Sequence, residues 1–153
     1  MLEWMLMPYS RYAEFSGRSR RKEYWMFTLF GILVMIPFGI LMFAGMPNLE
    51  AMADPVTAAS TESPGALFWV GVTGITIFGL GSLIPSIAVT IRRFHDRDMS
   101  GWWVLGFALL GAIPVVGGIF SIAQLVIMAL AGTPGSNRFG PDPLDPGQSN
   151  VFA

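Results

Sequence analysis

One short segment of this chain, residues 92–98, gathers the side-chain types that most often carry chemistry and reads RRFHDRD. His95 titrates near neutral pH, so with a neighbouring carboxylate it could act as a general acid or base. The spacing indicates no nucleophile, and a chain with one histidine and no cysteine lacks the usual ligands of a zinc or haem site. We therefore predict no catalytic residue, no metal and no cofactor. We expect a charged turn over residues 92–100, with Asp98 or Ser100 capping the next helix.

A second cationic cluster lies nearer the N-terminus and consists of Arg18, Arg20, Arg21 and Lys22. Each cation beside an anionic membrane surface is attracted to it by about 1 kcal/mol. A topology anchor is the simplest interpretation, and recognition of a phosphorylated ligand or partner is the alternative. Together the two clusters predict a polar platform that binds lipid headgroups, a ligand or a partner. Its candidate residues are Arg18, Arg20, Arg21, Arg92, Arg93, His95, Asp96 and Arg138.

The elements that must position these residues are apolar. Residues 24–45, 66–91 and 102–131 contain no charged side chain and no histidine. A helix of about 20 apolar residues crosses the hydrocarbon core of a bilayer. Only 12% of the chain is charged, against roughly 25% in soluble domains. We predict an all-α, small multi-pass transmembrane helix bundle. It forms a single membrane domain over residues 1–143, followed by a flexible tail over residues 144–153.

The third apolar stretch is too long for one ordinary span. A single helix over residues 102–131 would be about 45 Å long and would need a tilt near 48° to fit a core of about 30 Å. Pro114, Gly117 and Gly118 interrupt it at its centre. The bundle thus has two full spans plus a Pro/Gly-broken third stretch. This stretch is either one kinked span or a re-entrant hairpin that returns the tail to the cytoplasm, and we favour the hairpin.

The cations also predict the orientation. The loop over residues 46–65 contains three carboxylates and no cation, whereas both of its flanking spans begin or end at basic segments. By the positive-inside rule the loop is exported and the N-terminus is cytoplasmic. A cleaved signal peptide is the rival interpretation of the first span. Its apolar run of 22 residues exceeds the usual 7–15, so we predict a retained anchor in a bacterial inner membrane.

The chain ends add two expectations. Residues 1–16 form either a short interfacial helix ending near Pro8 or a loosely ordered N-terminus. Residues 132–143 are rich in turn-forming residues but contain Arg138 and Phe139, which suggests an ordered, docked turn.

Small and hydroxylated residues mark one face of the second span. Ser82, Ser86 and Thr90 recur every four residues and so share a helix face. Together with Gly74 they predict a helix-packing surface, because small residues let helices approach closely in lipid. The functional alternative is a polar path through a transporter subunit or small channel. No charged residue lies within the spans, which weakens that alternative.

Four segments together resemble a known family. They are RYAEFSGRSRRKEYW at residues 11–25, RRFHD at 92–96, SGWW at 100–103 and GTPGSNRFGPDP at 132–143. This order resembles the bacterial inner-membrane family called domain of unknown function 805 (DUF805), the YhaH-like proteins. The chain departs from it by a longer exported loop and by Asp98-Met99, where related sequences often have a glycine-containing turn. The resemblance implies an inner-membrane location and a small multi-pass fold, and it implies no established activity.

We therefore expect a small integral membrane protein of unknown activity, a non-enzymatic bundle with a cytoplasmic polar platform. Its expected partners are anionic membrane lipids, with a membrane-protein partner or self-association possible and no nucleic acid. The alternative is a transporter subunit or small channel. The third is a membrane enzyme that uses His95 and Asp96.

Overall fold

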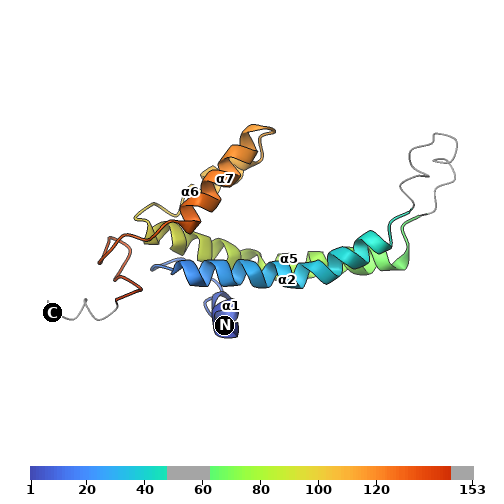
Figure 1. The fold of residues 1–153 in the computed structure, drawn as a ribbon, viewed down its shortest axis with the longest axis horizontal. Helices are drawn as coiled ribbons and strands as arrows, with labels where there is room; N and C mark the ends of the chain where they lie inside the picture. Colours follow the sequence, from blue (N-terminus) through green and yellow to red (C-terminus); the bar gives the residue numbers. More distant parts are fainter. Residues whose placement is uncertain (48–62, 146–153) are drawn as a thin grey trace. The chain divides into compact units, whose positions relative to one another are not determined.

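The structure, a computed structural model, describes residues 1–47 and 63–145 and is built from helices joined by turns (Figure 1). The helices are α1 (Leu2–Ser10), α2 (Arg21–Ala44), α5 (Ala66–Asp96), α6 (Trp103–Gly111) and α7 (Val116–Ala129). The described residues contain no β-strand and only an isolated bridge between Asn137 and Gly140. The all-α prediction is confirmed. Most of the predicted exported loop, residues 48–62, and most of the flexible tail, residues 146–153, lie outside the described residues.

Helices α2 and α5 are long and apolar enough to cross a membrane, judged by length and composition. They have 24 and 31 residues and therefore measure about 36 and 46 Å. Contacts divide the chain into two compact units, and the prediction of a single domain stays a prediction. The first, Met1–Leu29 with Leu83–Ala153, is called the base unit below, and the second is Phe30–Ser82.

Glycines bring α2 and α5 close together in the second unit, where the two helices lie side by side (Figure 1). A Cβ atom at Gly71 would lie 2.5 Å from the backbone nitrogen of Met42 and 2.6 Å from the carbonyl oxygen of Phe38. A Cβ atom at Gly74 would overlap the ring of Phe38. This close approach favours helix association by van der Waals contact, since lipid offers no hydrophobic driving force.

Helix α5 continues through the arginines and ends at Asp96. The expected charged turn over residues 92–100 is therefore wrong for its first five residues, which are helical. The backbone N–H groups of Asp98 and Met99 donate to the carbonyl groups of His95 and Phe94, and Asp98 has a φ of 57°. This is a Schellman C-cap with aspartate at the left-handed position that glycine usually occupies. Asp98 thus closes α5 and does not cap α6.

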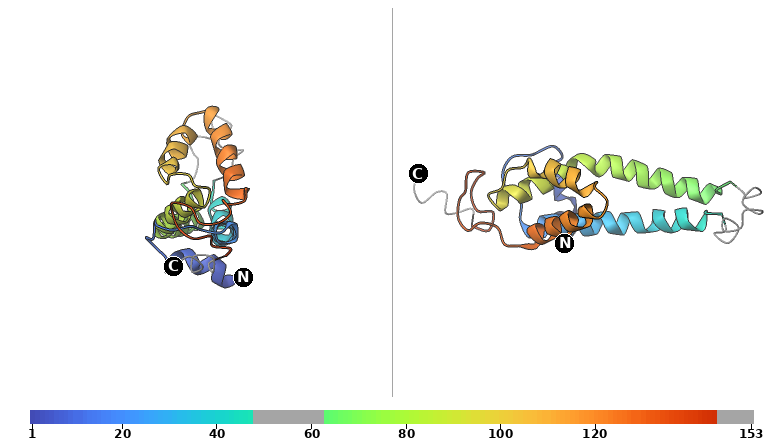
Figure 2. Two further views of the ribbon diagram at one scale, coloured as in Figure 1. Left: turned by 90° about the vertical axis from the view of Figure 1, so that its left-hand side faces the viewer. Right: turned by 90° about the horizontal axis from the view of Figure 1, so that it is seen from above.

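Helices α6 and α7 fold back on each other as a helical hairpin in the base unit (Figure 2). The turn between them contains Pro114, and a Cβ atom at Gly117 would overlap the carbonyl group of Gly111. With 9 and 14 residues the two helices measure about 14 and 21 Å, less than the bilayer core of about 30 Å. The broken third stretch is confirmed, and its two halves form a hairpin.

Aromatic side chains form the core of the base unit. Phe94 at the end of α5 stacks on Phe107 of α6 with 5.7 Å between ring centroids. Tyr9 of α1 meets Phe27 of α2 edge to face at 5.4 Å. The N-terminal helix is confirmed and ends at Ser10, two residues beyond Pro8. This core holds α1, α2, α5, α6 and α7 around the ends that carry the charged residues.

Candidate functional site

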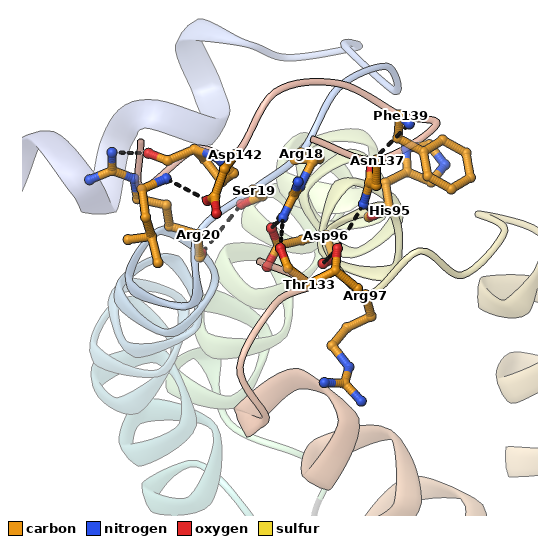
Figure 3. Close-up of polar contacts among 12 residues, drawn as sticks. Arg18, Ser19, Arg20, His95, Asp96, Arg97, Thr133, Asn137, Phe139 and Asp142 are labelled. Carbon is orange, nitrogen blue, oxygen red and sulfur yellow. Dashed lines mark hydrogen bonds and ion pairs between the residues drawn. The ribbon is translucent and has the colours of Figure 1, made fainter. Parts of the chain in front are cut away.

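Asp96 is the centre of a buried ionic network in the base unit (Figure 3). Its Oδ1 lies 2.9 Å from Nη2 of Arg18, and its Oδ2 pairs with Nη1 of Arg93 one helical turn earlier. The three side chains are 6%, 1% and 0% exposed, in the order Asp96, Arg18, Arg93. Because a buried charge needs a partner, the pairing of Asp96 with two arginines stabilises all three side chains in the base unit.

Backbone carbonyl groups satisfy the remaining donors of the two arginines. Arg18 donates to the carbonyl oxygens of Thr133 and Gly135, each at 2.6 Å. Arg93 donates to Met128 at 3.1 Å and to Leu130. These acceptors lie at the end of α7 and in the segment that follows it, so the network fastens the C-terminal segment to α5.

The docked segment is also held directly by Asp96. The backbone N–H of Thr133 donates to the Asp96 carbonyl oxygen at 2.8 Å, and a Cβ atom at Gly132 would overlap the Asp96 carboxylate. The prediction of an ordered, docked turn over residues 132–143 is confirmed. It follows that the C-terminal segment and the Arg18 segment lie together in the base unit.

A second buried pair joins the N-terminal segment to α5. Arg92, which is fully buried, lies 2.8 Å from Oε1 of Glu23 and donates to the carbonyl oxygen of Glu14 at 2.9 Å. The hydroxyl of Ser19 donates to the other oxygen of Glu23 at 2.8 Å. The backbone N–H of Ser19 donates to the Arg92 carbonyl oxygen. Arg92 and Arg93 therefore face two different partners and tie both ends of the chain to one helix.

His95 is held by its surroundings on three sides. Its Nδ1 lies 3.1 Å from the carbonyl oxygen of Gly17, whose φ of +79° suits a glycine. Its ring stacks on Phe139 with centroids 3.9 Å apart and planes 4° apart. Asn137 donates to the His95 carbonyl oxygen at 2.9 Å. Because a carbonyl oxygen only accepts, Nδ1 carries the proton and Nε2 of the neutral ring is an acceptor.

The eight platform candidates thus have four different environments. Arg18, Arg92, Arg93 and Asp96 are buried and paired with one another or with Glu23. His95 is half-buried, and Arg138 lies on the surface with its side chain 61% exposed. Arg138 pairs with Asp98 at 3.1 Å and lies over the Phe139 ring at 4.8 Å. Arg20 and Arg21 line a pocket that Arg18 also borders, and none of the ion pairs among the described residues involves them.

That basic pocket has a volume of about 550 Å³ and lies between the start of α2 and the docked C-terminal segment. Arg20 donates to the carbonyl oxygen of Pro143, and Lys22 lies over the Trp4 ring of α1 at 5.0 Å. The pocket is lined by Arg18, Arg20, Arg21, Lys22, Asp96, Ala131, Gly132, Thr133, Pro134, Asp142, Pro143 and Leu144.

Asp142 holds the outer wall of the basic pocket. Its carboxylate accepts from the backbone N–H groups of Leu144 at 2.9 Å and Gly135 at 3.0 Å. These bonds, the one from Leu144 first, lower the pKa of Asp142 below its usual value, and the charges of Arg18 and Arg20 add to the effect.

Several members of the network were missed by sequence reasoning. Glu23, Thr133 and Asn137 were not singled out, although each is hydrogen-bonded to an arginine or to His95. The i, i+4 spacing of Ser19 with Glu23 and of Thr133 with Asn137 is a local signal for such contacts. Nothing in the sequence pattern indicates that Arg18 contacts Thr133 and Gly135, which lie 115 and 117 positions further along the chain.

The predicted helix-packing residues on α5 differ in their contacts. Gly74 faces Phe38, as described above, and Ser82 is half-buried. Ser86 and Thr90 donate to carbonyl groups of their own helix, to Leu83 at 2.7 Å and to Ser86 at 2.6 Å. Within the described ranges, no group of three or more His, Cys, Asp or Glu residues could hold a metal ion.

The helical fold, the apolar α2 and α5 and the hairpin define the class as a small all-helical membrane protein. The family described as "Protein of unknown function (DUF805)" matches residues 12–141, and the chain belongs to this family. It is 40% identical over 146 residues to "Inner membrane protein YhaH" of Escherichia coli (strain K12), covering 93% of this chain and 97% of that protein. "Inner membrane protein YhaI" of the same strain is 33% identical over 142 residues, covering 93% and 96%. No solved structure matches the chain.

Proposed function

We propose that this chain is a multi-pass inner membrane protein whose base unit lies at the cytoplasmic surface and binds anionic lipid headgroups in the basic pocket. The names of the relatives support the membrane, and the cation distribution supports the orientation. The protein acts as a binding module and carries out no reaction of its own.

The observation that carries the proposal is the net positive charge of the basic pocket, whose lining contains four cations and two carboxylates. None of the ion pairs among the described residues involves Arg20, Arg21 or Lys22. Arg18, in contrast, is neutralised by Asp96. Phosphate oxygens pair well with guanidinium groups, which present several donors in one plane. Trp4 beside Arg20 and Lys22 has the amphipathic ring typical of the headgroup region.

The test compares two lipids that differ in headgroup charge. Purified protein in a neutral detergent is melted with added dioleoylphosphatidylglycerol or with added dioleoylphosphatidylcholine. A ligand that binds only the folded state raises its stability in proportion to the logarithm of its concentration over Kd. We expect stabilisation by the anionic lipid alone, because the phosphatidylcholine headgroup has no net charge.

A triple variant, with Arg20, Arg21 and Lys22 changed to Gln, distinguishes lipid binding in the basic pocket from attraction of the lipid to the overall positive charge of the protein. Three cations at about 1 kcal/mol each correspond to a loss of affinity on the order of a hundredfold. The matched control is Arg138→Gln, an exposed cation outside the pocket, which should keep the lipid preference. An unchanged preference in the triple variant, or none in the parent protein, would contradict the proposal.

A further inference from the structure

A second pocket of the base unit has the opposite chemistry. It is a groove of about 510 Å³ between the last turns of α5 and the start of α6. Ile87 and Ile91 form its wall on α5, and Trp102 and Leu105 form the wall at α6. Trp102 is 77% exposed and Leu105 is 53% exposed. Exposed apolar side chains of this size in a membrane protein are suited to contact with lipid chains.

The groove has one fixed polar atom with no partner of its own. No described residue donates a hydrogen bond to Nε2 of His95, whereas Nδ1 is engaged by the Gly17 carbonyl group. The Phe139 ring fixes the plane of the imidazole. Gly101 leaves space beside Nε2, because a Cβ atom there would lie 3.1 Å from it and 2.7 Å from Cγ2 of Ile91. The result is an acceptor with a fixed direction at an apolar wall.

The uncharged lining of the groove determines which kind of headgroup it can bind. Its lining contains no Lys, Arg, Asp or Glu, and Arg138, which lies over the Phe139 ring beside it, is already paired with Asp98. A charged group in such a place would lose hydration without gaining an oppositely charged partner. A hydroxyl group, in contrast, can donate one hydrogen bond to the lone pair of Nε2. Ser100 is a further polar residue that lines the same groove.

We propose that this groove binds a neutral lipid with a free hydroxyl group, whose hydroxyl donates to His95 Nε2 and whose chain lies along Ile91 and Leu105. Diacylglycerol is the probe that has this chemistry. The site is separate from the basic pocket, which has cations and takes an anionic headgroup. It does not depend on the proposed function.

The experiment uses the full chain in phosphatidylcholine nanodiscs with a diacylglycerol that carries a diazirine in one acyl chain. After illumination, mass spectrometry locates the adducts. We expect adducts on residues of the groove, at Ile91 and Leu105. Unlabelled dioleoylglycerol should compete, and its methyl ether, which lacks the donor hydrogen, should not. Equal competition by the methyl ether, or by dioleoylphosphatidic acid, would overturn the proposal without any need for a variant.

Two variants then test the residues. His95→Asn keeps a donor toward Gly17 and removes Nε2, so labelling should require about two- to tenfold more probe, the effect of one hydrogen bond. Leu105→Trp fills the groove and should abolish specific labelling. Unchanged labelling in both variants would overturn the proposal. The Arg20, Arg21 and Lys22 triple variant should keep the parent labelling, so failure of one site is distinguishable from failure of the other.

Discussion

The buried network requires a negative charge at Asp96, and the substitution Asp96→Asn tests this requirement. Asn keeps the size of the side chain but removes the charge that Arg18 and Arg93 share. Both guanidinium groups are at most 1% exposed, so water cannot replace the carboxylate. Removing one partner of a buried ion pair typically costs about 3–5 kcal/mol. At about 2–4 °C per kcal/mol for a chain of this length, the melting temperature should fall by roughly 6–20 °C.

The matched control is Asp98→Asn, two residues further along. Asp98 pairs with Arg138, but their side chains are 47% and 61% exposed. Exposed pairs contribute about 0–1 kcal/mol, and asparagine tolerates the left-handed backbone of this position. Both variants are melted in the same detergent and followed by circular dichroism at 222 nm, a standard helix signal. Equal melting of the two variants would refute the buried network as a source of stability. Arg18→Gln in the Asp96→Asn background should recover part of the loss, because it removes one unpaired charge.

Two further predictions concern the hairpin and the docked segment. Gly117→Ala should destabilise the α6–α7 hairpin, because the added Cβ atom would overlap the Gly111 carbonyl group, whereas Gly118→Ala, with nothing within 4 Å, should not. The melting temperature and the monodispersity of both variants are measured, and equal behaviour of the two would contradict the close approach of Gly117 to Gly111. Hydrogen bonds lower the pKa of Asp142 in the folded state. The stability that the Asp142 carboxylate contributes to the docked segment is therefore complete above the usual aspartate pKa of about 3.9 and is lost as the pH falls below that value. A spin label at Ser136 should therefore gain mobility on acidification, and in Asp142→Asn it should be mobile already at pH 7; the same mobility profile in both proteins would contradict this.

Much of the fold was predictable because the bilayer restricts the chain so strongly. The absence of charge from residues 24–45 and 66–91 predicted α2 and α5 nearly in full, since a span must satisfy its backbone internally. The break near Pro114 followed from the missing N–H of proline and the freedom of the adjacent glycines. The continuation of α5 to Asp96 was not predictable in this way, because arginines usually mark the end of an apolar span.

The candidate site was predictable in composition and not in arrangement. A buried carboxylate near arginines demands a pair, so the contact of Asp96 with an arginine followed from charge alone. The pairing of Asp96 with Arg18, 78 positions earlier in the sequence, depends on how the chain folds around the end of α5. The same folding buries Arg92 and Arg93 and leaves Arg20 and Arg21 at a pocket. Residue type therefore could not separate the structural arginines from those that are free to bind a ligand.

The proposed function requires that the base unit lies at the cytoplasmic surface, with its N-terminal and C-terminal segments on the same side of the membrane. The chain has no cysteine, so a single introduced thiol reports its own position. Cysteines are placed at Ser16 and at Ser136, both exposed in the base unit, and at Ser60 in the predicted exported loop. A membrane-impermeant maleimide should label only the Ser60 position in intact spheroplasts and all three after permeabilisation. Labelling of the Ser136 position from outside, with the Ser16 position protected, would place the two segments on opposite sides and contradict the account.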